Sequence, residues 1–169
     1  KLGYQAEFIQ KSVLSAKREE KSGQSFSHVI IALVFGALLF FIAMGPMVGI
    51  PLPAWIAPEE NPLRYAVLQG ILLAPIVFLG FHFYVSGFRA LFRGHPNMDS
   101  LIAIGTLAAI AYSIYAVSAI ARGVPHAVHN LYFESGGMII ALVMLGKYLE
   151  HRAKDRTGRA VEALIRLAP

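Results

Sequence analysis

Four long stretches that are almost free of charge most strongly limit how this chain can fold. They run from about His28 to Val48, from about Tyr65 to Val85, from about Leu101 to Ala121, and from about Leu131 to Leu149. A helix needs about 20 mainly apolar residues to cross a hydrocarbon core of about 30 Å. The chain is 56% hydrophobic and only 15% charged, which is not the composition of a water-soluble domain. We therefore predict a polytopic membrane protein.

The basic residues predict how the four spans are oriented. Thirteen of the fifteen Lys and Arg residues lie before span one, between spans two and three, or at the last turn of span four and beyond it, and only Arg64 and Arg122 lie in the opposite loops. Because positive loops stay in the cytoplasm, we expect both termini there. The prediction is an all-α fold with four transmembrane helices in two hairpins and cytoplasmic helical extensions at both ends. The net charge of +5 then reflects membrane orientation, and we expect no nucleic-acid partner.

The chain divides into four predicted regions. Residues 1–27 form a cytoplasmic linker helix, 28–95 the first two spans, 96–149 the third and fourth spans, and 150–169 a second cytoplasmic helix. The chain starts at Lys1 and stops at Pro169 inside a helical pattern. We therefore expect a piece of a larger protein.

The cytoplasmic end of span two has the composition of a surface helix. From Gly80 onward, aromatic residues alternate with polar ones that include Arg89 and Arg93, which suits a helix lying in the membrane interface. Gly80 provides a place to bend. One interpretation is a basic platform that receives a protein or an ion. The other is an ordinary helix end with an aromatic belt and arginines that extend to the interface.

Carboxylates mark the two ends of span four. Glu134 lies inside the span near its outer end, and an ionisable residue in a span is a functional candidate. Glu150 follows sixteen positions later, about 24 Å along a helix, and therefore marks the cytoplasmic face. Each carboxylate is also consistent with a plain hydrated charge, and for Glu150 this includes pairing with Lys147 or Lys154 at helical spacing.

Met98 comes just before span three, on the cytoplasmic side. Because spans three and four are antiparallel, Met98 and Glu150 are expected at the same membrane level. A thioether beside a carboxylate suits transient capture of a soft monovalent ion such as Cu(I), although methionine is also a common packing residue. The weaker metal-binding candidates, for which packing or solvation is the simpler explanation, are Met44, Met47, His126 and His129.

Several site classes are excluded within these residues. There is no cysteine, so the chain has no disulfide and no thiolate metal site. It also has no glycine-rich phosphate loop, His-Glu-x-x-His motif or nucleophile elbow. We therefore expect no catalytic and no nucleotide-binding residue in this chain.

The second half of the chain resembles a known family. The run HPNMDSLIAIGTLAAIAYSIYAV, and after a short loop YFESGGMIIALVMLGKYLEHRAKDRTGRAVEALIRLAP, resembles the third and fourth transmembrane helices of copper-transporting P-type ATPases, the heavy-metal subclass, leading into the actuator domain. Spans one and two resemble the two extra N-terminal helices of that subclass. Residues 2–6 resemble the last strand of a ferredoxin-like metal-binding domain, so 1–27 would follow a remnant of that domain.

This resemblance implies a membrane-domain fragment of an ATP-driven Cu(I) export pump. Met98 and Glu150 match the family's cytoplasmic copper uptake site, and Glu134 matches the glutamate on its release path. The family's Gly-Gly bend is Leu79-Gly80 here, so only one glycine matches. Residues 135–137 are Ser-Gly-Gly, where the family usually has alanines. This difference is expected to loosen the helix near the exit.

The resemblance also implies partners. The platform would receive copper from a copper chaperone or from the N-terminal metal-binding domain. ATP and Mg would bind to other domains of the parent ATPase, and the third uptake ligand and the Cys-Pro-Cys site would also lie elsewhere in it. The chain alone should therefore be inactive as an enzyme. Its location would be the lipid bilayer of a bacterial or archaeal plasma membrane. The alternatives are a pump of the same class for Zn(II) or another heavy metal, and a non-enzymatic four-helix membrane scaffold.

Overall fold

The regular structure in the described part of the chain is entirely helical. The computed structural model describes the backbone of residues 26–166, and the side chains of that range except residues 125 and 155–166. The predicted linker helix in 1–27 and the strand remnant at 2–6 fall almost wholly outside the described residues. The helices are α2 (Phe26–Met44), α3 (Pro62–Leu79), α4 (Phe81–Phe92), α5 (Met98–Ala121) and α6 (Phe133–Arg166), with short 3₁₀ turns at Pro46–Val48, Ala54–Ile56 and Pro125–Asn130.

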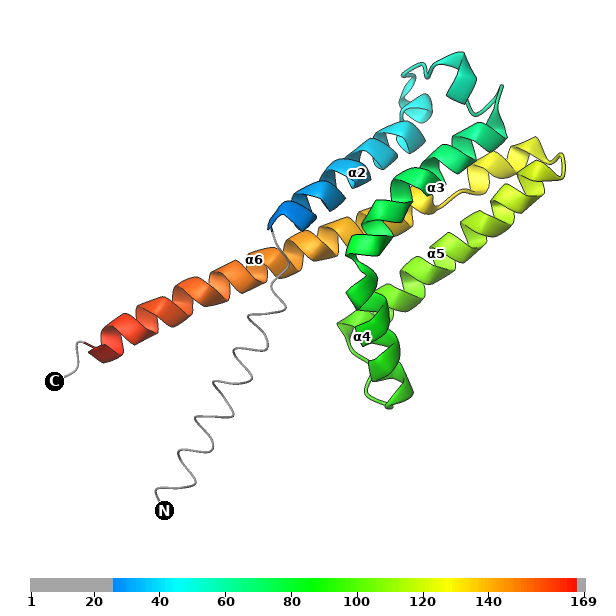
Figure 1. Ribbon diagram of the computed structural model, residues 1–169. Coiled ribbons are helices and arrows are strands. Elements are labelled where there is room, and N and C mark those ends of the chain that lie inside the picture. The colour runs from blue at the N-terminus through cyan, green and yellow to red at the C-terminus, as the bar shows by residue number, and fades with distance from the viewer. Residues whose placement is uncertain (1–25, 167–169) are drawn as a thin grey trace.

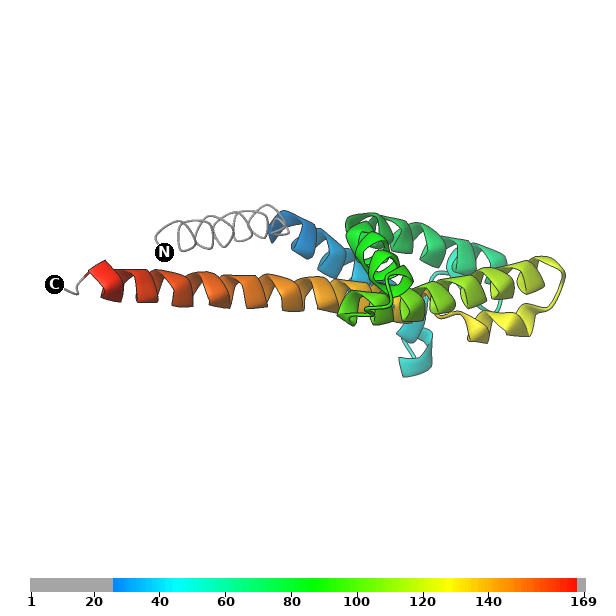
Figure 2. The ribbon, with the colours of Figure 1, turned by 90° about the horizontal axis from the view of Figure 1, so that it is seen from below.

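Four helical segments are long and apolar enough to cross a membrane. They are Phe26–Met44, Pro62–Leu79, Met98–Ala121 and His126–Lys154, so the predicted all-α fold with four spans is confirmed for the described residues. Helices α2, α3 and α5 and the first part of α6 run along one another (Figure 1). The rest of α6 continues as one straight helix beyond the bundle (Figure 2).

The first span ends earlier than the hydropathy pattern predicts. Helix α2 stops at Met44, and a 3₁₀ turn begins at Pro46. Proline has no N–H to donate and its ring clashes with the preceding turn. The apolar run up to Val48 is therefore not one helix.

The second span ends before Val85, at Gly80, where the sequence predicted a place to bend. Helix α3 ends at Leu79 and α4 starts at Phe81, and α4 leaves the direction of α3 (Figure 1). A Cβ atom at Gly80 would lie 2.5 Å from Cγ2 of Ile140 in α6. The missing side chain at Gly80 thus lets the α3–α4 corner pack directly against α6.

Small residues also bring α6 close to α2 and α3. A Cβ atom at Gly137 would lie 3.0 Å from Leu39 Cδ2 and 3.1 Å from Leu73 Cδ1, as is common where membrane helices pack tightly. Helix α6 runs without a break through residues 135–137, so this segment serves close packing and does not interrupt the helix. Outward-facing apolar side chains such as Phe78, which is 81% exposed, suit contact with lipid.

Candidate metal sites at the two ends of the bundle

A helix cap positions the first turn of α5. Asn97 Oδ1 accepts a hydrogen bond from the Ser100 backbone N–H (3.0 Å), and Ser100 Oγ accepts one from the Asn97 N–H (3.2 Å). This reciprocal capping box places Met98 and Asp99 at the helix N-terminus, where a negative charge is favourable. The Met98 side chain is 55% exposed, whereas Asp99 is 9% exposed.

An ion pair joins this first turn to α6. Lys147 Nζ lies 2.6 Å from Asp99 Oδ1, and the side chains are only 32% and 12% exposed. The same ammonium lies 4.8 Å from the centre of the Phe83 ring, a cation–π arrangement. Helices α4, α5 and α6 therefore meet at Lys147, and sequence reasoning assigned no role to Asp99.

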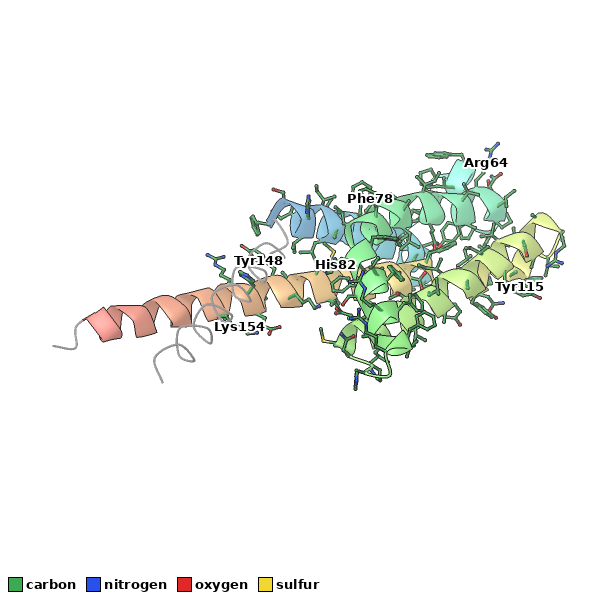
Figure 3. The ribbon with its side chains drawn as sticks, turned by 60° about the horizontal axis from the view of Figure 1, so that its bottom comes forward. Arg64, Phe78, His82, Tyr115, Tyr148 and Lys154 are labelled. Atoms are coloured by element: carbon green, nitrogen blue, oxygen red, sulfur yellow. The ribbon has the colours of Figure 1, made fainter. Side chains whose placement is uncertain are left out.

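His82 lies beside this junction. Its ring centre is 3.9 Å from that of Phe83, and Figure 3 shows it at the start of α4, toward the end from which α6 projects. Partial burial, and then the nearby Lys147 charge, lower the pKa of His82, while Asp99 and a backbone hydrogen bond at Leu79 act in the opposite direction. Partial burial and the ammonium thus both favour the neutral imidazole.

Glu150 lies one turn farther along α6 than Lys147. Of the two lysines expected near it, Lys154 is its partner (Nζ–Oε1 2.7 Å), and both side chains are mostly exposed. Three residues of helix correspond to about 4.5 Å. Because Lys147 contacts the residue next to Met98, the α5–α6 pairing puts Met98 and Glu150 at nearly the same level. Both side chains are open to the surface, where a cation can reach them.

Glu134 lies at the opposite end of α6, in its first turn. Its Oε1 accepts a hydrogen bond from Ser135 Oγ at 3.1 Å, and its charge acts on the Tyr65 hydroxyl. Tyr65 in turn lies 3.3 Å from the backbone carbonyls of Ile42 and of Ala43. The end of α2 and the starts of α3 and α6 thus form a polar cluster.

Gln69 extends this cluster into the bundle, and sequence reasoning did not identify it. Its side chain is 1% exposed and donates a hydrogen bond to the Tyr65 hydroxyl. Among the described residues, its Oε1 has no hydrogen-bond partner. A buried unpaired acceptor costs about 1–3 kcal/mol. The signal in the sequence was a lone amide within an apolar span.

Helix α4, for which the sequence offered the platform interpretation, is amphipathic. Arg89 and Arg93 are exposed, as is Phe92 (86%). On the other face, Ser100 Oγ donates a hydrogen bond to the Gly87 carbonyl at 2.8 Å. Helix α4 is therefore held against α5 by its inner face while its basic residues face outward.

The weaker candidates do not form a site. Met47 is 79% exposed, Met44 is half-buried, and His126 and His129 are exposed in the 3₁₀ turn before α6. Among the described residues, no three His, Cys, Asp or Glu side chains gather as a metal site.

Comparisons with known proteins match almost the whole chain. It is 41% identical over 137 residues to "Probable copper-importing P-type ATPase A" of Enterococcus hirae, covering 80% of this chain and 18% of that protein. It is 36% identical over 171 residues to "Copper-exporting P-type ATPase" of Staphylococcus epidermidis (98% and 20%), and 35% identical over 143 residues to "Copper-transporting ATPase 1" of Rhizobium meliloti (83% and 17%).

The chain spans about a fifth of the length of these curated relatives. No protein-family profile matches it, and no solved structure does.

Proposed function

We propose, from the premise that this chain belongs to the copper-transporting P-type ATPases, that it is a four-helix part of the membrane domain of an ATP-driven Cu(I) export pump. The similarity covers 80–98% of the chain in the relatives named above, and the described residues contain four candidate spans. The relatives are named for copper, which favours Cu(I) over Zn(II) as the cargo. Their being ATPases also argues against a non-enzymatic scaffold.

The uptake site of the proposed pump consists of Met98 and Glu150. The observation that carries this assignment is the ion pair between Lys147 and Asp99 at 2.6 Å, because it sets the register of α5 against α6 and so brings Met98 level with Glu150. A thioether prefers a soft ion, and the carboxylate supplies a compensating negative charge. Both side chains are more than half exposed, so the cation binds without unpacking the helices.

Release takes place at Glu134, at the other end of the same helix. The first turn of α6 holds the carboxylate where its charge acts on the Tyr65 hydroxyl. Gln69 lies one turn farther along α3 than Tyr65. Hard oxygen groups bind Cu(I) weakly, so this end favours dissociation of the ion. The excess of Lys and Arg in the other loops supports an outside position for Glu134 and cytoplasmic termini.

The platform is the docking surface for the copper donor. Gly80 allows α4 to turn away from α3, and Arg89 and Arg93 present positive charge on its exposed face. This surface suits an acidic partner, here a copper chaperone or an N-terminal metal-binding domain of the same pump. The parent protein works in the plasma membrane of a bacterium, the source of the relatives named above.

The energy for transport comes from outside this segment. ATP and Mg bind to other domains of the parent protein, which transmit the conformational change through α6 as it continues to Arg166. No side chain in this chain has a catalytic role in the proposal. The isolated chain is therefore expected not to hydrolyse ATP.

Substitution in the full-length pump tests the uptake site. Met98→Leu removes the thioether and Glu150→Ala removes the carboxylate, and each is expected to abolish copper-stimulated ATP hydrolysis in membrane vesicles. Met47→Leu is the matched control, since Met47 is exposed and lies at the opposite end of the bundle. Wild-type turnover in both test variants would refute the uptake role. Stimulation by Zn(II) and not by Cu(I) would refute the choice of cargo, and copper leaving inside-out vesicles would refute export.

A further inference from the structure

We propose that Asp99 is a positioning residue for cation uptake, which acts by holding the Lys147 ammonium away from Glu150. The inference rests on the proposed uptake function of Met98 and Glu150. It concerns a residue that lies beside the ligands and does not itself bind the cargo.

Lys147 has two carboxylates within reach. Asp99 lies across the helix interface, and Glu150 lies three residues farther along the same helix, a spacing at which side chains on a helix meet. The structure pairs Lys147 with Asp99 at 2.6 Å and Glu150 with Lys154 at 2.7 Å. The long-range pair is thus formed in preference to the local one.

The surroundings explain this preference. The Asp99 side chain is 12% exposed, and the capping box of α5 holds its backbone in place. The Lys147 ammonium is also held over the Phe83 ring. Charges that are partly shielded from water interact more strongly than exposed ones. The Glu150 side chain is much less shielded than that of Asp99, since it is 59% exposed. Asp99 is therefore the stronger partner for Lys147.

Loss of Asp99 would change the uptake site in two ways. The ammonium would become free to pair with Glu150 and so compete with a monovalent cation for one carboxylate. Its positive charge would also be uncompensated next to the incoming cation. The existing pair between Glu150 and Lys154 is weaker, because the Lys154 side chain is 75% exposed and such surface pairs exchange readily. The Lys147 side chain is only 32% exposed, so its charge is less screened by water.

Helix α4 ties the same pair to the platform. Phe83, which faces the ammonium, is fully buried, and Gly87 one turn later packs against the Asp99 backbone. Asp99 thus sits where the platform helix meets the uptake site.

The test measures copper-stimulated ATP hydrolysis by the full-length pump in vesicles, as a function of buffered Cu(I) concentration. Asp99→Asn is expected to raise the KM for Cu(I) about tenfold, because one uncompensated positive charge would repel the cation and compete with it for Glu150. The kcat should stay within about twofold of wild type. Lys147→Gln should leave the KM at or below the wild-type value. In the Lys147→Gln background, adding Asp99→Asn should not raise the KM. Glu60→Gln, an exposed carboxylate in the loop between α2 and α3, is the control for loss of one negative charge.

A purely structural ion pair predicts a different pattern. Asp99→Asn and Lys147→Gln would then impair the pump alike, and the double variant would not recover, which would overturn the proposal. An unchanged KM in Asp99→Asn would also overturn it. If Asp99→Asn does not fold, the comparison between Lys147→Gln and wild type decides, because a raised KM in Lys147→Gln contradicts the proposal. Failure of the uptake site itself is recognised separately, by wild-type turnover of both Met98→Leu and Glu150→Ala.

Discussion

Among the glycines of the described residues, a Cβ atom at Gly87 would come closest to a neighbouring backbone, and replacing this glycine with alanine should destabilise the fold. A Cβ atom there would lie 2.4 Å from the Asp99 carbonyl oxygen, 2.7 Å from its carbonyl carbon and 3.0 Å from Ala103 Cβ. Two of these atoms belong to the backbone of α5, so no side chain can rotate to make room. Helix α4 would have to move away from α5.

The magnitude follows from three terms. Overpacking costs about 1–3 kcal/mol, and losing the hydrogen bond from Ser100 Oγ to the Gly87 carbonyl costs about 1 kcal/mol. Alanine regains about 0.5–1 kcal/mol because it is a better helix former than glycine. The net loss of stability for Gly87→Ala is about 2 kcal/mol. For a chain of this length that lowers Tm by about 4–8 °C.

Thermal unfolding in detergent micelles, followed by circular dichroism, measures this effect. Gly105→Ala is the matched control, because Gly105 also lies inside a helix but a Cβ atom there would meet no neighbouring atom within 4 Å. Its Tm should equal or exceed that of wild type. If Gly87→Ala and Gly105→Ala have the same Tm, then α4 is not packed on the backbone of α5 and the described geometry of α4 is wrong.

Two further predictions concern Gln69 and His82. Gln69→Leu removes an amide oxygen that lacks a partner, so we expect a stability gain of about 1 kcal/mol in the same assay; a lower Tm would mean that a bound water satisfies this amide. For His82, whose pKa is lowered by burial and by Lys147, the contribution to stability is complete above about pH 6.5 and is lost as the pH falls through the lowered pKa. The Tm of wild type should therefore fall more between pH 7.5 and pH 5.5 than that of His82→Gln, and equal decreases would contradict this assignment. In an NMR titration, Lys147→Gln should raise the pKa of His82.

The local pattern was sufficient to predict the class of fold. Spans are recognised from the length and apolarity of a continuous segment, because a helix in lipid satisfies its own backbone hydrogen bonds. The positions of Met98, Glu134 and Glu150 at the ends of spans follow from the same reasoning. Their roles in copper transport remain predictions until the variants are measured.

Helix rotation and helix breaks were harder to predict. The apolar residues of a span show no preferred face. The lone amide of Gln69 was a signal for an inward position, but nothing local indicated that its oxygen would lack a partner. The sequence offered Gly80 as a place to bend, but it did not show which neighbouring helix would pack against the bend. In the structure, Ile140 of α6 occupies the space that a side chain at Gly80 would need.

The amino-acid sequence by itself determined that four helices cross the membrane and which charged residues mark their ends, because these properties depend only on neighbouring residues. The choice of partner for Lys147 was decided by tertiary structure. Glu150 is three positions from it and Asp99 forty-eight, and only the packing of α4 and α5 against α6 makes the distant carboxylate the closer and better shielded one.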